Sequence, residues 1–108
     1  MATAPTRVSF GASAFNTATT PKTVSITTQV GDRVAVIVVC ESGNGGAVNT
    51  APTATGVTFT QRATLGTDAN TTRAVAWTGT ATTAGTYNVS AVIPVGNTSQ
   101  WFGVLVWV

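Results

Sequence analysis

The segment WFGVLVWV, Trp101 to Val108, decides the fold class because it is apolar on both faces of any strand that it forms. Successive side chains of a β-strand point to opposite faces of the sheet. One face would carry Trp101, Leu105 and Trp107, and the other would carry Phe102, Val104, Val106 and Val108. Neither face is polar, so the segment predicts a strand that is buried on both sides.

One face of this strand can fill the core of the chain, and the other face needs a second cover. Exposed apolar strands are aggregation hazards, and Lys and Glu, which protein interfaces tend to lack, occur once each here. Either the N-terminal segment folds over this face or another subunit docks on it, and we expect a neighbouring chain to supply the cover, in a closed homo-oligomer such as a trimer. The candidate interface residues are Trp101, Phe102, Val104, Val106, Trp107 and Val108.

Composition indicates an all-β protein. Charged residues make up 7% of the 108 residues, against about a quarter in ordinary domains. Threonine is the most frequent residue, and β-branched residues suit a pleated sheet. The length fits one domain over residues 1–108, with residues 1–6 as a flexible N-terminal arm.

Seven segments have the pattern of strands, and Gly, Asn or Pro turns separate them. They cover residues 7–14, 22–30, 33–40, 57–65, 71–80, 86–93 and 101–108. Tight turns are expected at Gly31-Asp32 and Ala84-Gly85. This spacing predicts a single antiparallel β-sandwich of seven to eight strands, either immunoglobulin-like or jelly-roll in topology.

Alternation within these segments predicts which side chains face the core. The expected inward sets are Val24, Ile26, Thr28 and Val30, then Val57, Phe59, Ala63 and Leu65, then Val75 and Trp77, then Tyr87, Val89, Ala91 and Ile93. RVAVIVVC, from Arg33 to Cys40, is nearly all apolar and predicts a strand covered on both faces. Residues 41–56 are expected to form a long loop, in which Asn44, Gly45 and Gly46 are candidate contact residues.

The segment from Gly85 to Val89 resembles the corner before a late strand of immunoglobulin-like sandwiches. In that corner a tyrosine hydroxyl bonds to the backbone upstream. Tyr87 is the corresponding residue here.

The residue types needed for common catalytic and metal sites are missing from the sequence. There is no histidine and one cysteine, which excludes Ser-His-Asp triads and the usual zinc sites. Asp32 and Glu41 flank one predicted strand, and Asp68 lies in another loop, so no pair of facing carboxylates is expected. We predict no enzyme activity, no catalytic residues, no cofactor and no metal.

Charge and hydropathy bear on partners and location. The five basic residues are scattered rather than clustered, so nucleic-acid binding is not expected. No apolar run approaches the roughly 18 residues of a membrane span, and the N-terminus lacks the apolar core of a signal peptide. We expect synthesis in a cytoplasm and no membrane insertion.

Three segments resemble small β-sandwich proteins of tailed-phage virions. They are VGDRVAVIVV (Val30 to Val39), AWTGTATTAGTYNV (Ala76 to Val89) and the closing WFGVLVWV. The resemblance implies a non-enzymatic virion protein, most simply a capsid decoration (cement) protein that stabilises the major capsid lattice, or an immunoglobulin-like tail domain. Its partners would be the major capsid protein or tail proteins, and the glycine-rich loop or the N-terminal arm would become ordered on the shell.

The alternative function is a carbohydrate-binding or adhesion module of a phage fibre or bacterial surface protein. Sugar-binding sandwiches use exposed aromatic side chains as stacking platforms, and Trp77, Trp101 and Trp107 are the candidates. Trp77 is expected in the core rather than at such a site.

Overall fold

The computed structural model describes residues 10–12, 16–17, 21–41, 50–66, 72–92 and 101–108. These residues form β-strands and contain no helix, so the described part of the chain is all-β, as predicted. In chain order the strands are β1 Phe10–Ala12, β2 Asn16–Thr17, β3 Lys22–Thr28, β4 Arg33–Glu41, β5 Thr60–Gly66, β6 Thr72–Thr80, β7 Gly85–Ala91 and β8 Trp101–Trp107.

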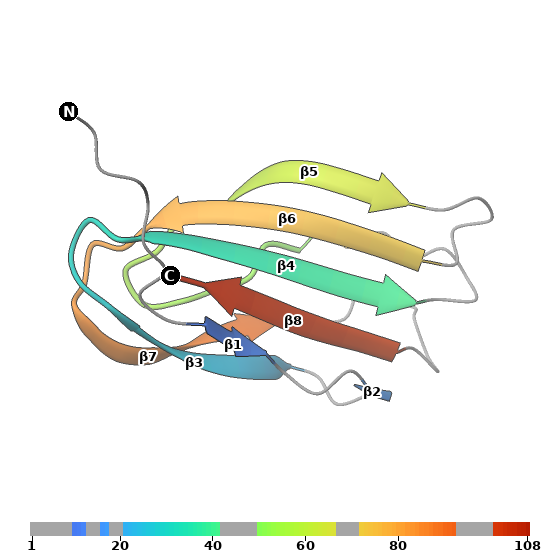
Figure 1. Cartoon of the computed structure of the whole chain (residues 1–108), viewed down its shortest axis with the longest axis horizontal. Helices are drawn as coiled ribbons and strands as arrows, with labels where there is room; N and C mark the ends of the chain where they lie inside the picture. Colours follow the sequence, from blue (N-terminus) through green and yellow to red (C-terminus); the bar gives the residue numbers. More distant parts are fainter. Residues whose placement is uncertain (1–9, 13–15, 18–20, 42–49, 67–71, 93–100) are drawn as a thin grey trace.

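The strands form two antiparallel sheets that lie in two layers (Figure 1). The larger sheet has the order β1-β8-β4-β6-β5, and β2 also pairs with β8. The smaller sheet pairs β3 with β7. The buried apolar side chains lie between these layers, which confirms the predicted antiparallel β-sandwich.

Strand pairing is nested around the turn at Thr55–Gly56. Successive pairs lie nearly symmetrically on either side of it: Ala54 with Val57, Arg33 with Thr80, Lys22 with Ala91 and Phe10 with Trp107. The chain is thus a long hairpin, rolled so that β4 also meets β8 and β5 also meets β6. β1 and β2 pair with β8, the last strand, and β3 pairs with β7, the strand before β8. Of the two topologies that the sequence left open, this order favours the jelly roll.

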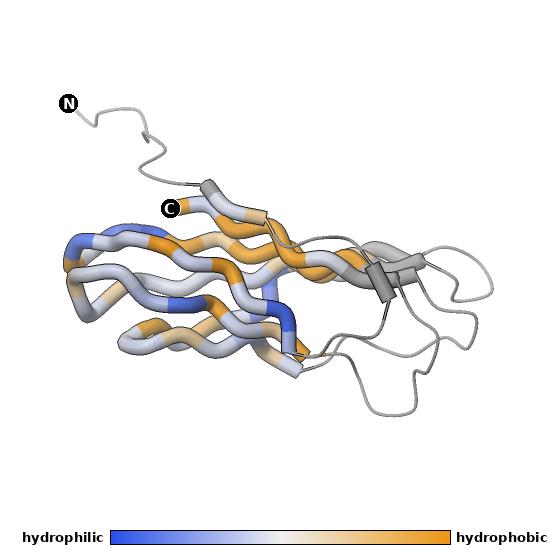
Figure 2. The backbone as a smooth tube through the Cα atoms, turned by 90° about the horizontal axis from the view of Figure 1, so that it is seen from below, coloured by the Kyte–Doolittle hydropathy of each residue, from blue (hydrophilic) through white to orange (hydrophobic). Residues whose placement is uncertain are grey.

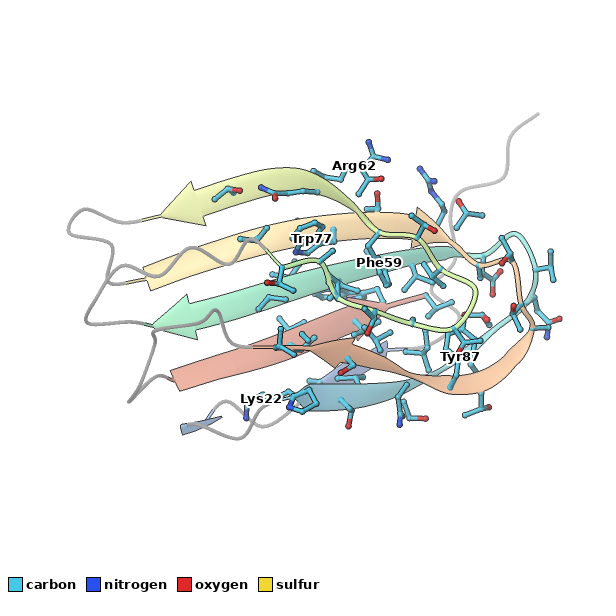
Figure 3. All side chains as sticks on the ribbon, turned by 180° about the vertical axis from the view of Figure 1, so that it is seen from behind. Lys22, Phe59, Arg62, Trp77 and Tyr87 are labelled. Carbon is cyan, nitrogen blue, oxygen red and sulfur yellow. The ribbon has the colours of Figure 1, made fainter. Side chains whose placement is uncertain are left out.

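The core is built mainly from valine. The fully buried valines are Val34, Val36, Val38, Val75, Val89, Val104 and Val106. Trp77 and Phe59 supply its two large side chains, on the inner side of the larger sheet (Figure 3). Valine has few rotamers and packs well on a pleated surface, so a valine core strongly favours sheet over helix.

The segment between β4 and β5 completes the second layer. Thr53 N donates to Ser90 O at 2.9 Å, and Ser90 N donates to Thr53 O at 2.8 Å, so this segment extends the smaller sheet beyond β7. It then crosses β6 at Gly79, where a Cβ atom would lie 2.5 Å from Val57 Cγ1 and 2.6 Å from Thr58 O. The later part of the predicted loop 41–56 is therefore paired with β7 and belongs to the second layer. Residues 42–49 lie outside the described residues.

The tight turn predicted at Gly31-Asp32 is present. Because of this turn β3 ends at Thr28, two residues before the predicted end at Val30. Asp32 Oδ2 accepts a hydrogen bond from Gln29 N at 2.8 Å, and Asp32 N donates to Gln29 O at 3.1 Å. Gly31 has a φ of +95°, which favours glycine. Val30 lies in this turn and is 70% exposed, so the prediction that it shares the buried face of Val24 is wrong.

A β-bulge in β5 makes the predicted face of Ala63 wrong. Gln61 pairs with Trp77, but Ala63 pairs with Ala76, so Arg62 is an extra residue between them. The bulge moves Ala63 off the buried face that simple alternation predicted, and its side chain is exposed.

Candidate functional site

The side of the larger sheet that faces away from β3 and β7 is apolar and half-buried. We call the outer face the following side chains: Ala35, Ile37, Val39, Ala74, Ala76, Leu105 and Trp107. They come from β4, β6 and β8, the three inner strands of the sheet, and none is charged. Figure 2 shows hydrophobic colouring along much of the strand that ends at the C-terminus.

Strand register joins these side chains into one patch. Ile37 pairs with Leu105 on one side and with Ala76 on the other. One row further along, Ala35 pairs with Trp107. Neighbouring strands lie about 4.8 Å apart, so paired side chains on one face touch or nearly touch. The outer face is therefore continuous, with Ile37 near its centre.

The two sides of β4 are in different environments. The second layer covers one side, and the other side forms part of the outer face. Val34, Val36 and Val38 are fully buried against the second layer. The alternate residues of β4 are only half-buried, and no described layer covers them. The described residues therefore cover one of the two faces of β4 that the sequence predicted to be covered.

The structure decides which face of β8 enters the core. Val104, Val106 and Val108 are buried with exposures of 0%, 0% and 8%, so they belong to the core and not to the predicted interface. They point toward the second layer, which leaves Trp107 and Leu105 on the outer face. Trp107 is thus the one predicted interface residue whose described side chain lies on the outer face.

Several predicted site residues fall outside what the structure describes. Trp101 and Phe102 begin β8, but their side chains lie outside the described part of the chain. The same holds for the whole of Asn44, Gly45 and Gly46.

A second surface feature adjoins the outer face, where β4, β6 and β5 meet the segment before β5. It is an open groove of about 520 Å³. We call it the arginine–threonine groove, after the side chains that dominate its lining: Arg33, Thr58, Thr60, Arg62, Thr78 and Thr80. Figure 3 shows Arg62 at the β5 edge of the larger sheet, at the opposite side from Lys22.

Threonine hydroxyls on β6 hold both arginines of this groove. Arg33 Nη1 donates to Thr80 Oγ1 at 3.1 Å, and Arg62 Nε donates to Thr78 Oγ1 at 2.7 Å. The β-bulge at Arg62 makes the second contact possible, because it adds a residue that reaches back over β6. The sequence gives no sign of this site, because Arg33 on β4 and Arg62 on β5 come together only where both strands flank β6 in the sheet.

Trp77 is not available as a sugar platform. Its side chain is 5% exposed and belongs to the core, which confirms the predicted burial. Its Nε1 has no hydrogen-bond partner in the described part of the chain. Of the three tryptophans proposed for stacking, Trp107 alone has a described, partly accessible side chain.

The described residues contain neither a cluster of metal-ligating side chains nor a membrane-spanning helix. Within the described residues, no three His, Cys, Asp or Glu side chains gather into a group that could hold a metal ion. No helix in that part of the chain is long and apolar enough to cross a membrane.

No protein family, curated protein or solved structure matches this chain in the comparisons. Its function is therefore inferred from its own residues and surfaces.

Proposed function

We propose that this chain is a non-enzymatic structural protein of a tailed-phage virion, most simply a capsid decoration protein that docks on the major capsid lattice through its outer face. The observation that carries this proposal is the continuous, uncharged patch centred on Ile37. The centres of protein interfaces are depleted of charged residues and enriched in aromatic residues. The patch fits this composition, since it carries no charge and includes Trp107. The resemblance of three segments to virion β-sandwich proteins supplies the class of partner.

The size of the outer face favours several contacts acting together. Its three strands lie about 4.8 Å apart, and the stretch of β4 from Ala35 to Val39 rises about 3.3 Å per residue, so the face measures roughly 14 Å by 17 Å. That is smaller than the roughly 800 Å² that each partner of a standard interface buries. A single copy would therefore bind weakly through the outer face alone, and tight binding would need further contacts made by the rest of the molecule.

Co-sedimentation with empty capsids tests the proposal. We expect the wild-type protein to pellet at a fixed ratio with capsids of the phage that encodes it. Ile37→Lys places a charge at the centre of the outer face and should weaken binding at least about tenfold, because a buried unpaired charge is costly. Ser25→Lys is the matched control, since Ser25 is exposed on β3 in the other layer. Absence of wild-type binding, or equal binding by both variants, would refute the proposal.

The carbohydrate-binding alternative loses its tryptophan platform at Trp77, because that side chain is buried. A different observation, the arginine–threonine groove, offers another form of ligand binding.

A further inference from the structure

Toward the described residues, the two arginines of the groove use only a small part of their hydrogen-bonding capacity. A guanidinium has five N–H donors, and each arginine donates one hydrogen bond to a threonine of β6. The described carboxylate nearest in sequence is that of Asp32, whose Oδ2 accepts a hydrogen bond from the backbone of Gln29. The remaining donors of Arg33 and Arg62 are thus available to an anion that enters the groove.

The spacing of the two threonines determines how far apart the arginines are anchored. Thr78 and Thr80 lie on the same face of β6, two residues apart, which is about 7 Å in an extended strand. Because each guanidinium is tied to one of them, the two positive charges are held along one line above β6 rather than moving freely. A planar guanidinium pairs best with a carboxylate, through two parallel hydrogen bonds.

The rest of the lining indicates a ligand rich in hydroxyl groups. Threonine hydroxyls both donate and accept hydrogen bonds, which complements sugar hydroxyls, and they line the groove between the arginines. None of the described side chains that line the groove is aromatic, whereas proteins that bind single-stranded nucleic acid stack bases on aromatic rings. The described lining also contains no large apolar side chain that could pack against the side chains of a peptide.

From these contacts we propose that the arginine–threonine groove binds an acidic saccharide chain, with Arg33 and Arg62 pairing uronate carboxylates and the threonines bonding to sugar hydroxyls. The volume of about 520 Å³ suits a short oligosaccharide segment. The site is open, so a longer chain can pass through it. This binding is independent of capsid docking, because it uses the rim and not the centre of the outer face.

Isothermal titration calorimetry with oligogalacturonate tests the proposal, with mannan oligosaccharide as the neutral probe. We expect sub-millimolar binding of oligogalacturonate at low ionic strength, weakening as salt is added, and no binding of the mannan. Arg33→Gln and Arg62→Gln should each weaken binding roughly tenfold, and the double variant should abolish it. Arg33→Lys keeps the charge but loses the paired geometry, so it should also bind more weakly.

Matched control variants distinguish the loss of a groove arginine from the loss of net positive charge. Arg73→Gln removes the same charge near the other end of β6 and should bind like wild type. Ile37→Lys, which tests capsid docking, should also keep saccharide binding, so the two proposals can fail separately. Thermal unfolding checks that each variant is folded.

Three results would overturn the saccharide proposal. Oligoglutamate that binds as tightly as oligogalacturonate would indicate an acidic protein partner. Oligothymidylate that binds more tightly would indicate nucleic acid. Equal weakening by Arg73→Gln would show that binding reflects overall charge and not the groove.

Discussion

The hydroxyl of Tyr87 lies 2.8 Å from the hydroxyl of Thr28, and Thr28 Oγ1 in turn donates to the carbonyl of Thr83 at 2.8 Å. A threonine hydroxyl has one hydrogen, so Tyr87 must be the donor to Thr28. The sequence predicted a bond from this tyrosine to the upstream backbone. The structure makes that connection through Thr28, which links the end of β3 to β7 and to the turn before it.

Removing Thr28 should cost more than removing the tyrosine hydroxyl. Thr28→Val leaves both Tyr87 Oη and Thr83 O without their partner, and we expect a loss of about 2–3 kcal/mol of unfolding free energy. Tyr87→Phe leaves the bond from Thr28 to Thr83 intact and should cost about 1 kcal/mol. Urea denaturation measures both.

The control for this pair is Thr27→Val. Thr27 Oγ1 lies 2.9 Å from Thr86 Oγ1 at an exposed position on the same strand pair, so its loss should cost less than about 0.5 kcal/mol. Equal costs for Thr27→Val and Thr28→Val would contradict a structural role for the relay.

Two glycines should respond differently to alanine. At Gly79 a Cβ would meet the backbone oxygen of Thr58 at 2.6 Å, so Gly79→Ala should cost about 2 kcal/mol or more, with no rescue by truncating Val57. At Gly11 the close contact is with the Val24 side chain alone. Gly11→Ala combined with Val24→Ala should therefore cost less than the sum of the single changes, as denaturation midpoints would show.

Away from the capsid, the outer face should drive self-association of the isolated protein, in a contact that docking on the capsid would replace. Size-exclusion chromatography with light scattering should show an oligomer that dissociates on dilution, since the patch is small for a permanent interface. Leu105→Lys should shift the protein to monomer, and Thr23→Lys, on the exposed side of β3, should not. A wild-type monomer at high concentration would rule out the homo-oligomer.

Trp77 should tolerate phenylalanine better than its size suggests. Trp77→Phe loses packing area but also removes a buried Nε1–H that has no described partner, and an unsatisfied buried donor costs about 1–3 kcal/mol. We expect a net change within about 1 kcal/mol for Trp77→Phe and a loss of about 3–5 kcal/mol for Trp77→Ala. Thermal unfolding distinguishes them, and a large loss for Trp77→Phe would indicate a hydrogen bond to this nitrogen.

Sequence alternation predicted faces correctly where a strand is regular and one side is polar. Val24 and Ile26 on β3, and Val75 on β6, are buried as expected. The same reasoning failed at Ala63, because a bulge adds a residue that alternation cannot register. It also could not choose between the two faces of β8, since both are apolar and one strand alone carries no information about its neighbours.

The candidate sites required the pairing of distant strands. Arg33 and Arg62 come together because β4 and β5 both flank β6, an arrangement that follows from rolling the long hairpin around Gly56. No spacing in the sequence marks this, because pairing between distant strands depends on how the whole chain closes.

Composition and two-residue periodicity act locally along the chain, so they were enough to predict an all-β protein with an apolar C-terminal strand. Tertiary packing places Val104 and Val106 in the core and leaves Leu105 and Trp107 on the outer face. It also decided that two arginines share one groove. Both outcomes depend on which strands become neighbours, and that choice is made by packing the two layers against each other.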